Sequence, residues 1–290
     1  MGQQRKKSAP QIKLAGMVTL YHPNDKDIAN ISTYLDDVDH LYVIDNTEER
    51  SNEKRLPDNP KIEYIWGREN IGVASALNLA AKKAQKAGFN WLLTNDQDTT
   101  FPPQVLKKLK KHAAKVDPQK IAIVTPWHHT KLRDEKLQTD DDPHDVMTSG
   151  NLLNLDIWQK IGGFKEELFI DGVDIEYCIN LHKQGYHILR VNSLEIDHNL
   201  GDLFYRTFAG RLYLCTNHPA IRRYYLMRNY HYIYDLYSDY DFDYCNALAA
   251  SQKHNMIGVL LFEKQKIAKI RMYLKGYRDY SRHIMGKYQG

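Results

Sequence analysis

Short apolar runs alternate with amphipathic stretches along the first half of the chain. The runs end at polar or turn-forming residues, as buried strands do, and cover 14–20, 41–44, 62–66, 91–94 and 121–125. Between them, 72–87 is rich in Ala and Leu and is followed by Gly88, and 103–114 has Pro in its first turn, so we predict helices there. Strands that alternate with helices predict an α/β fold with a mostly parallel sheet flanked by helices.

The second half of the chain follows a different pattern. The segment 131–145 is charged and is predicted to be a mobile loop that serves as a lid. Further helices are predicted over 156–161 and 174–184, a strand over 186–191, and helices of a Tyr-rich tail over 219–237, 244–262 and 265–283. We therefore expect a flexible N-terminus over 1–12, an α/β domain over 13–218 and a C-terminal helical region over 219–290.

Composition and charge narrow the class of protein. Apolar residues make up 42% and charged residues 26% of the 290 residues, which is ordinary for a globular protein. The net charge of +4 is too small to indicate a nucleic-acid-binding protein. The segment 263–290 is nevertheless basic, with eight Lys or Arg against two acids. Such an end either binds anionic groups, such as lipid headgroups, or is a solvated helix face.

Cysteine spacing and the lack of targeting signals indicate the cellular compartment of the protein. Cys178, Cys215 and Cys245 are far apart and odd in number, so neither a zinc site nor a disulfide framework is predicted. The N-terminus lacks the apolar stretch of a signal peptide, and no apolar run is long enough to span a membrane. We expect a cytoplasmic protein whose contact with the inner face of the cell membrane, through the basic C-terminus, is peripheral.

Polar residues follow three of the predicted strands directly. Tyr21 and His22 follow the first, Asp45 and Asn46 the second, and 96–98 the fourth. Because parallel sheets bind ligands beyond the carboxyl ends of their strands, these residues are expected to face one crevice. The pattern alone therefore predicts a ligand site at this edge.

Asp96 and Asp98 flank one residue at the end of a predicted strand. In an extended segment they would project to the same side, where two hard oxygen donors suit Mg²⁺ or Mn²⁺ bound to a diphosphate. Such a metal offsets the charge on a departing nucleoside diphosphate. The alternative is that these acids cap a turn.

Asp171, Asp174 and Glu176 form a second acidic cluster, beside an apolar Phe-Ile pair. Clustered acids repel one another, so at least one is expected to have a raised pKa, as a general base for an acceptor hydroxyl requires. Asp171 or Asp174 could instead cap the helix that follows. His198 is a further candidate metal ligand, although a lone His is more often structural.

The segment 222–229 interleaves Arg and Tyr. Such residues bind phosphates or sugar rings, or they belong to an ordinary helix packed against the sheet. On a helix, Arg222, Tyr225 and Asn229 share one face.

Taken together and in this order, these segments resemble the GT2 family of glycosyltransferases, and within it the bacterial rhamnosyltransferases. The resemblance extends from about residue 13 to residue 229, and the Arg-Arg-Tyr-Tyr-x-x-Arg-Asn stretch favours rhamnosyl transfer. The segments that carry it are 18–23, 43–46, 69–78, 95–98, 149–151, 169–176 and His198.

The resemblance implies a GT-A fold with the donor at the carboxyl edge of the sheet. It implies Asp174 as the catalytic base, with Asp171 as the second choice. It implies that Asp96, Asp98 and His198 surround Mn²⁺ or Mg²⁺. It also implies that the nucleotide-sugar contacts Thr19, Tyr21, Asp45, Arg68, Asn70, Asn78, Asp96, Ser149 and Gly150. The first strand ends in Tyr-His-Pro where many relatives have Tyr-Asn-Pro, which leaves the contact to the base open.

The implied reaction is an inverting transfer of L-rhamnose from dTDP-β-L-rhamnose to a saccharide acceptor, lipid-linked and part of a bacterial surface polysaccharide. Another donor, UDP-galactofuranose, UDP-glucose or UDP-GlcNAc, is the alternative within the class. A nucleotidyltransferase would need a Gly-rich loop after the first strand, and 21–25 contains no Gly. A non-catalytic membrane- or nucleic-acid-binding module would leave the acidic clusters unexplained. We expect no nucleic-acid partner, and nothing in the sequence excludes a homodimer.

Overall fold

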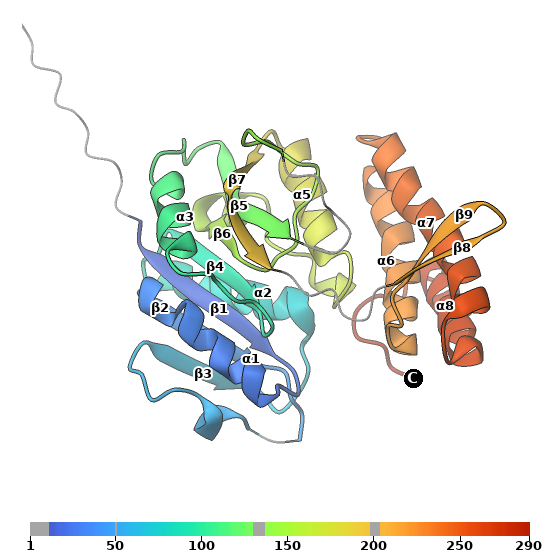
Figure 1. The fold of residues 1–290 in the computed structure, drawn as a ribbon, viewed down its shortest axis with the longest axis horizontal. Helices are drawn as coiled ribbons and strands as arrows, with labels where there is room; N and C mark the ends of the chain where they lie inside the picture. Colours follow the sequence, from blue (N-terminus) through green and yellow to red (C-terminus); the bar gives the residue numbers. More distant parts are fainter. Residues whose placement is uncertain (1–11, 50, 130–136, 198–203) are drawn as a thin grey trace, which may run out of the picture.

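A seven-stranded, mostly parallel sheet forms the centre of the computed structural model, which describes residues 12–49, 51–129, 137–197 and 204–290 (Figure 1). The strand order is β3-β2-β1-β4-β6-β5-β7, and β6 alone runs antiparallel to its neighbours. The strands are β1 (Leu14–Leu20), β2 (His40–Asp45), β3 (Ile62–Trp66), β4 (Trp91–Asp96), β5 (Ile121–His129), β6 (Asn151–Asn154) and β7 (His187–Asp197). Residues 1–11 of the predicted flexible N-terminus, 131–136 of the predicted lid and His198 lie outside the described residues.

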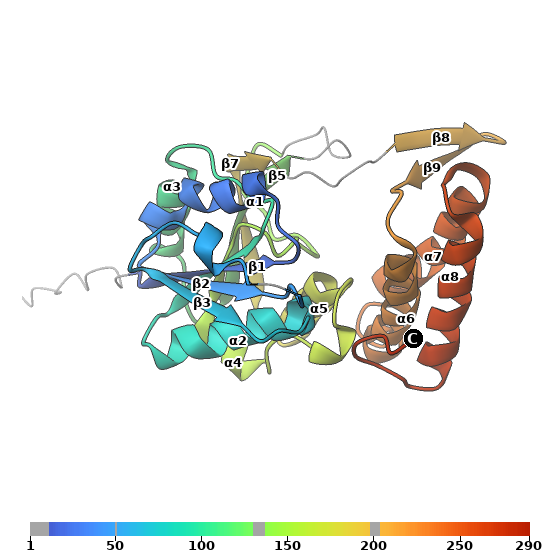
Figure 2. The ribbon, with the colours of Figure 1, turned by 90° about the horizontal axis from the view of Figure 1, so that it is seen from below.

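Helices cover both faces of this sheet, as Figure 2 shows. The helices of the α/β part are α1 (Asp25–Asn30), α2 (Gly72–Lys86), α3 (Val105–Ala113), α4 (Leu155–Lys160) and α5 (Val173–Lys183). Along β1, Ala15 and Met17 face the core with α2, α4 and α5, whereas Val18 and Leu20 face the core with α1 and α3. Because both faces are buried, the parallel strands read as continuous apolar runs, which is why the sequence identified them.

Two strand features were not predicted. β6 has four residues, all buried, and is inserted between β4 and β5. Only two of the four are apolar, so the segment does not stand out as an apolar run. A hairpin of β8 (Phe204–Phe208) and β9 (Arg211–Cys215) follows the main sheet in sequence. Its turn residues, Ala209 and Gly210, both have positive φ, at 48° and 73°, which is the conformation of the favoured two-residue hairpin turns.

The C-terminal helices form a bundle beside the sheet, next to α5 (Figure 1). They are α6 (Ala220–Tyr237), α7 (Phe242–Phe262) and α8 (Lys266–Ser281), and their ends lie within two residues of the predicted ones. An apolar cluster of Ile179 on α5 with Ile233, Tyr237 and Cys245 joins the bundle to the α/β part. None of the described helices is long and apolar enough to cross a membrane.

Candidate active site

The carboxyl ends of β1, β2 and β4 lie side by side. The strands are parallel, and the register pairs Leu20 with Asp45 and Thr19 with Asp96. The backbone N–H of Tyr21 donates to Gln97 Oε1 over 2.8 Å, which ties the turn after β1 to the turn after β4. The polar residues that follow these strands therefore share one edge of the sheet, as the sequence predicted.

Asp45 is buried beneath this edge. Its carboxylate accepts hydrogen bonds from the backbone N–H of Thr47 (2.9 Å), from Asn52 Nδ2 (2.9 Å) and from the Tyr64 hydroxyl (2.6 Å). The Tyr64 hydroxyl has its pKa raised to about 12, mainly by burial and then by this hydrogen bond to Asp45. Asp45 thus holds the loop after β2 against β3, and it would act on a nucleotide chiefly by shaping that loop.

Tyr21, Arg68 and Asn70 are the more accessible residues at the β1–β2 end of the edge. Tyr21 is exposed, and its hydroxyl is hydrogen-bonded to the Asn70 side chain. Arg68 has a left-handed backbone (φ 62°), and its guanidinium lies 5.3 Å from the centre of the Trp66 ring. An exposed phenol, an amide and a cation therefore lie where the resemblance implies the nucleotide.

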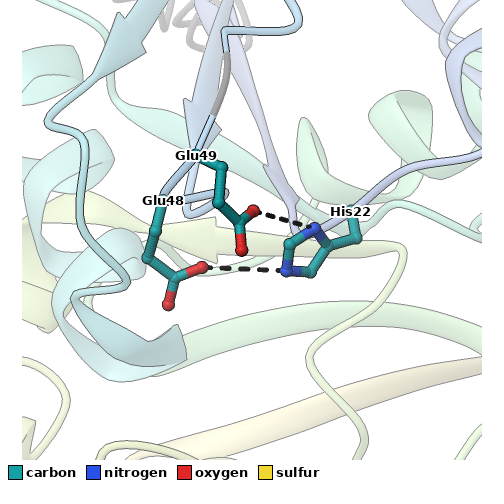
Figure 3. A group of neighbouring side chains, drawn as sticks. All are labelled: His22, Glu48 and Glu49. Carbon is teal, nitrogen blue, oxygen red and sulfur yellow. Dashed lines mark ion pairs between the residues drawn. The ribbon is translucent and has the colours of Figure 1, made fainter.

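His22, Glu48 and Glu49 form a group at the same end that sequence reasoning did not assemble (Figure 3). The imidazole nitrogens of His22 lie 3.7 Å from a carboxylate oxygen of each Glu. A second group, His129, Glu195 and Asp197, lies at the ends of β5 and β7. These are the groups in the described part of the chain that bring three metal-ligand atoms together, and neither contains Asp96 or Asp98.

Asp96 and Asp98 lie on either side of a turn. Asp96 is the last residue of β4, and the backbone N–H of Thr99 donates to the Asp96 carbonyl over 3.1 Å, so Gln97 and Asp98 are turn residues. The prediction that both acids project from an extended segment was wrong, because the strand ends at the first of them. Asp96 is half-buried and Asp98 is exposed, and both remain at the carboxyl edge of the sheet.

Ser149 and Gly150 pack against the end of β4. The Ser149 hydroxyl donates to the Asp96 carboxylate, and the Gly150 N–H donates to the Thr94 carbonyl over 2.7 Å. Gly150 has φ 77°, and a Cβ at this position would lie 2.5 Å from the Ile196 side chain. Only glycine therefore fits there, and this fit brings Ser149 onto the first acidic cluster.

The loop 169–172 carries the second acidic cluster in a strained backbone. Phe169, Asp171 and Gly172 all have positive φ, at 66°, 64° and 80°. The Phe169 carbonyl accepts from the N–H of Val73 over 2.7 Å at the start of α2, and a Cβ on Gly72 would lie 2.5 Å from the Phe169 ring. Such strain persists only where neighbouring structure enforces it, and it is common at functional sites.

Residues of α6 enforce this conformation. The Asn229 amide donates to the carbonyls of Leu168 (2.9 Å), Ile170 (2.8 Å) and Asp171 (2.7 Å). The Arg228 guanidinium, which is fully buried, donates to the carbonyls of Glu167 and Leu168, which directly precede this loop. Arg228 and Asn229 therefore have a structural role, in agreement with the interpretation of 222–229 as an ordinary packed helix.

Arg222 is the exception, because it binds an acid of the second cluster and its pKa responds to an acid of the first. Its guanidinium donates to both carboxylate oxygens of Asp171, with Nε to Oδ2 at 2.6 Å. Burial alone would lower the pKa of Arg222, but the Asp171 carboxylate raises it and Asp96 adds to the effect. Burial raises the pKa of Asp171, although Arg222 opposes that shift. Asp96 and Asp171 therefore act electrostatically on one cation.

Asp174 lies in the first turn of α5. The residue at the N-cap position is Gly172, which has no side chain to cap the helix. Asp174 Oδ1 accepts a hydrogen bond from the backbone N–H of Ile175 at 3.0 Å. Burial, with smaller contributions from the carboxylates of Asp145 and Asp171, raises the pKa of Asp174 to about 7. Asp174 also lines a small void with residues at the end of β4, including Thr94. A carboxyl group with this pKa suits a general base.

Glu176 contacts α6 instead of the other two acids. Its side chain is fully buried, and it accepts a hydrogen bond from the Tyr237 hydroxyl of α6. Burial raises the pKa of Glu176 to about 7. The third acid of the cluster therefore belongs to the contact between α5 and α6.

Asn78 does not belong to the cleft either. Its amide donates to the Phe164 carbonyl (2.8 Å) and to Glu166 Oε1 (2.9 Å), and its oxygen accepts from Trp158 Nε1 and from the Phe164 N–H. These bonds use both donors and both acceptor positions of the Asn78 amide and hold α2 against the loop after α4. We therefore no longer propose Asn78 as a contact of the nucleotide-sugar. It borders a hollow of about 1050 Å³, whose lining includes none of Asp96, Asp171 and Asp174.

Solved structures share this architecture. GalNAc-T7 with UDP, GalNAc and Mn²⁺ aligns over 94% of this chain with a TM-score of 0.59 and 13% identity, and this chain covers 56% of it. TarS 1-349 of S. aureus with UDP-GlcNAc aligns over 94% of this chain and 82% of its own, with a TM-score of 0.58 and 12% identity. PcManGT, a mannosyltransferase of Pyrobaculum calidifontis with GDP-Man and Mn²⁺, aligns over 94% and 83%, with a TM-score of 0.54 and 12% identity. These likenesses show a GT-A fold.

Sequence comparison identifies the family. The dTDP-rhamnosyl transferase RfbF of Shigella flexneri is 24% identical over 233 residues, which cover 73% of this chain and 77% of that protein. Residues 31–179 match the family model described as Glycosyl transferase family 2, and this match includes Asp96, Asp171 and Asp174. Because the match covers just over half of the sequence, the chain belongs to glycosyl transferase family 2 and is a glycosyltransferase.

Proposed function

We propose that this glycosyltransferase moves L-rhamnose from dTDP-β-L-rhamnose to a saccharide acceptor, with inversion at the anomeric carbon. The acceptor would be a lipid-linked saccharide of a bacterial surface polysaccharide. The observation that carries the proposal is Arg222, whose guanidinium binds both carboxylate oxygens of Asp171 and whose pKa is also raised by the Asp96 carboxylate. A transferase needs a diphosphate-binding group and a base in one cleft, because it must hold the diphosphate and deprotonate an alcohol in the same step.

Asp174 is proposed as the catalytic base. As the acceptor oxygen forms a bond to C1 of the sugar, its proton passes to the Asp174 carboxylate. The bond between C1 and the diphosphate oxygen breaks, and the nucleoside diphosphate leaves with the electron pair. A pKa of about 7 leaves a large share of Asp174 ionised at neutral pH and still makes it a useful proton acceptor. Arg222 would face the leaving diphosphate, where negative charge develops.

A divalent cation fits the donor chemistry of the turn after β4. Asp96 and Asp98 supply carboxylate oxygens, which Mg²⁺ and Mn²⁺ prefer as ligands, and we propose them as the metal-binding residues, with His198 as a further ligand. The structures of GalNAc-T7 and PcManGT contain Mn²⁺, which supports a metal of this class. When bound, the cation would offset the charge of the leaving diphosphate.

The choice of rhamnose rests on the relative from Shigella flexneri, a dTDP-rhamnosyl transferase. The residues proposed around the nucleotide, such as Tyr21, Arg68 and Asn70, do not distinguish thymine from uracil by their chemistry. A UDP-sugar donor, UDP-galactofuranose, UDP-glucose or UDP-GlcNAc, is therefore the competing hypothesis.

A donor panel separates the two hypotheses. The full chain with Mn²⁺ is incubated with dTDP-β-L-rhamnose and with each of the three UDP-sugars, and the released nucleoside diphosphate is measured. We expect release of dTDP alone, loss of release with EDTA, and recovery when Mn²⁺ or Mg²⁺ is added in excess. Release of UDP from one UDP-sugar alone would refute the rhamnosyl assignment, and full activity in EDTA would refute the metal role.

A further inference from the structure

The β8–β9 hairpin, the end of α7 and the start of α8 lie at one end of the helical bundle (Figure 2). The hairpin packs on the last turns of α7, where the Tyr213 ring stacks on His254 at 4.4 Å and the Phe208 and Phe262 rings are 6.5 Å apart. α8 begins four residues after α7 ends, so its first turn lies at the same end. We call this end the bundle corner and define it by the hairpin, 254–262 and 263–268.

Large apolar side chains protrude from the bundle corner without covering one another. Leu212 is 57% exposed and Phe208 is 53% exposed on the hairpin, and Ile267 of α8 is 73% exposed. The exposed face of α7 next to the hairpin is also apolar, with Ile257, Leu260 and Leu261. Such a concentration of exposed apolar side chains on one end of a protein typically marks an interaction surface.

The charge of the bundle corner has one sign. Arg206 and Arg211 of the hairpin and Lys264 and Lys266 at the start of α8 are exposed. Glu263 is the only acid of 204–215 and 254–268, all of which the structure describes, and it is not available to offset them. It is 3% exposed and is paired with Arg223 and with Lys269, each at 2.7 Å.

We propose that the bundle corner binds an anionic lipid bilayer, with Phe208, Leu212 and Ile267 inserted at the interface and the Arg and Lys side chains on the headgroups. Exposed apolar side chains beside cations are the combination that binds such an interface, since burial of the former and attraction of the latter act together. A nucleic acid would use the cations and leave the apolar side chains unburied. A second copy of this chain would bring like charges together.

The position of the corner connects it to the cleft. The hairpin leads directly into α6, and the first turn of α6 carries Arg222, which binds Asp171. A bilayer at the corner would therefore lie close in the chain to Arg222, and it would hold a lipid-linked acceptor near the acidic clusters. This last consequence rests on the proposed function, whereas the lipid binding does not.

Vesicle co-sedimentation of the full chain, without donor or acceptor, tests the proposal. The vesicles contain phosphatidylcholine alone or a mixture with phosphatidylglycerol. We expect binding to the mixed vesicles only, and weaker binding at high salt. Phe208→Ser with Leu212→Ser, and separately Arg206→Gln with Arg211→Gln, should each weaken binding about tenfold or more. Leu137→Ser with Lys108→Gln, at exposed positions elsewhere, is the matched control and should bind as the parent does.

Several outcomes would overturn the proposal. They are no binding to the mixed vesicles, equal binding to phosphatidylcholine alone, or unchanged binding of both hairpin variants. A salt-dependent complex with DNA that the Arg variant loses and the apolar variant keeps, in the absence of vesicle binding, would assign the corner to nucleic acid instead. A dimer by light scattering that the apolar variant dissociates, again without vesicle binding, would assign it to self-association. Because no glycosyl transfer is measured, failure here is distinct from failure of the donor panel.

Discussion

Arg222 of α6 binds both carboxylate oxygens of Asp171, a residue 51 positions earlier in the chain. The match to the family ends at residue 179, before the helix that carries Arg222 begins. The C-terminal helical region therefore contributes directly to the candidate active site. It also fixes the backbone of that site, since Asn229 binds the loop that carries Asp171.

Replacement of Arg222 by Lys tests this contribution. Lys keeps the charge but cannot bind both oxygens of a carboxylate, so Asp171 loses its orientation and the diphosphate loses its proposed partner. We expect kcat to fall by about tenfold or more and the melting temperature to change little. Arg271→Lys, at an exposed position of α8, is the matched control and should leave both values unchanged. An unaltered kcat in the Arg222 variant would remove it from the site.

The pH dependence of transfer tests Asp174. Its folded pKa is about 7, and the base must be ionised, so kcat/KM should rise about tenfold per pH unit below that value and level off above it. Asp174→Asn should reduce turnover by about a hundredfold or more and retain donor binding, measured by calorimetry. A profile without this step, or turnover retained in the Asn variant, would assign the base elsewhere.

Glu176 makes the stability of the fold depend on pH. Burial raises its pKa from 4.5 to about 7, so folding favours the protonated form. This contribution is fully present below the unfolded pKa and is lost as the pH rises through about 7. Glu176→Gln removes the ionisation and should stabilise the chain on the order of 2 kcal/mol at about pH 8, with little effect at about pH 4. Urea unfolding at both pH values measures this, and an equal effect at both would contradict it.

Asn229→Ala tests the support of the strained loop. The variant leaves three carbonyls without their amide donor, and we expect a loss of roughly 2–4 kcal/mol in the free energy of unfolding. Because the loop carries Asp171, activity should fall even at a temperature where the variant is folded. Asn246→Ala, at an exposed position of α7, serves as control. Full activity in the folded Asn229 variant would show that the loop keeps its conformation without the amide.

The main sheet could be predicted from sequence because its parallel strands are buried on both faces and bounded by polar turns. β1 and β3 have the predicted ends, and the polar residues after β1, β2 and β4 meet at one edge, as expected. β6 escaped prediction because its sequence, Asn-Leu-Leu-Asn, has only two apolar residues between two amides and so does not form an apolar run. The hairpin escaped because its turn, Ala209-Gly210, is not one of the common turn dipeptides.

The candidate site was less predictable, since its geometry depends on contacts between distant segments. Nothing in the local sequence separates Arg222, which reaches Asp171, from Arg223, which pairs with the buried Glu263. The same limit applies to Asn78, whose partners lie more than eighty residues away. A motif can mark a residue as important without showing whether it binds a ligand or holds the fold.

A crystal structure of the full chain with dTDP-β-L-rhamnose and Mn²⁺, with Asp174→Asn used to prevent turnover, tests whether the two acidic clusters form one donor site. Anomalous scattering locates the Mn²⁺, and the account predicts it at the carboxylates of Asp96 and Asp98. The diphosphate should lie between this ion and Arg222, with the residue at position 174 facing the C1 atom of the sugar. A donor bound with its diphosphate remote from Asp96, or with position 174 on the far side of the fold, would contradict the account.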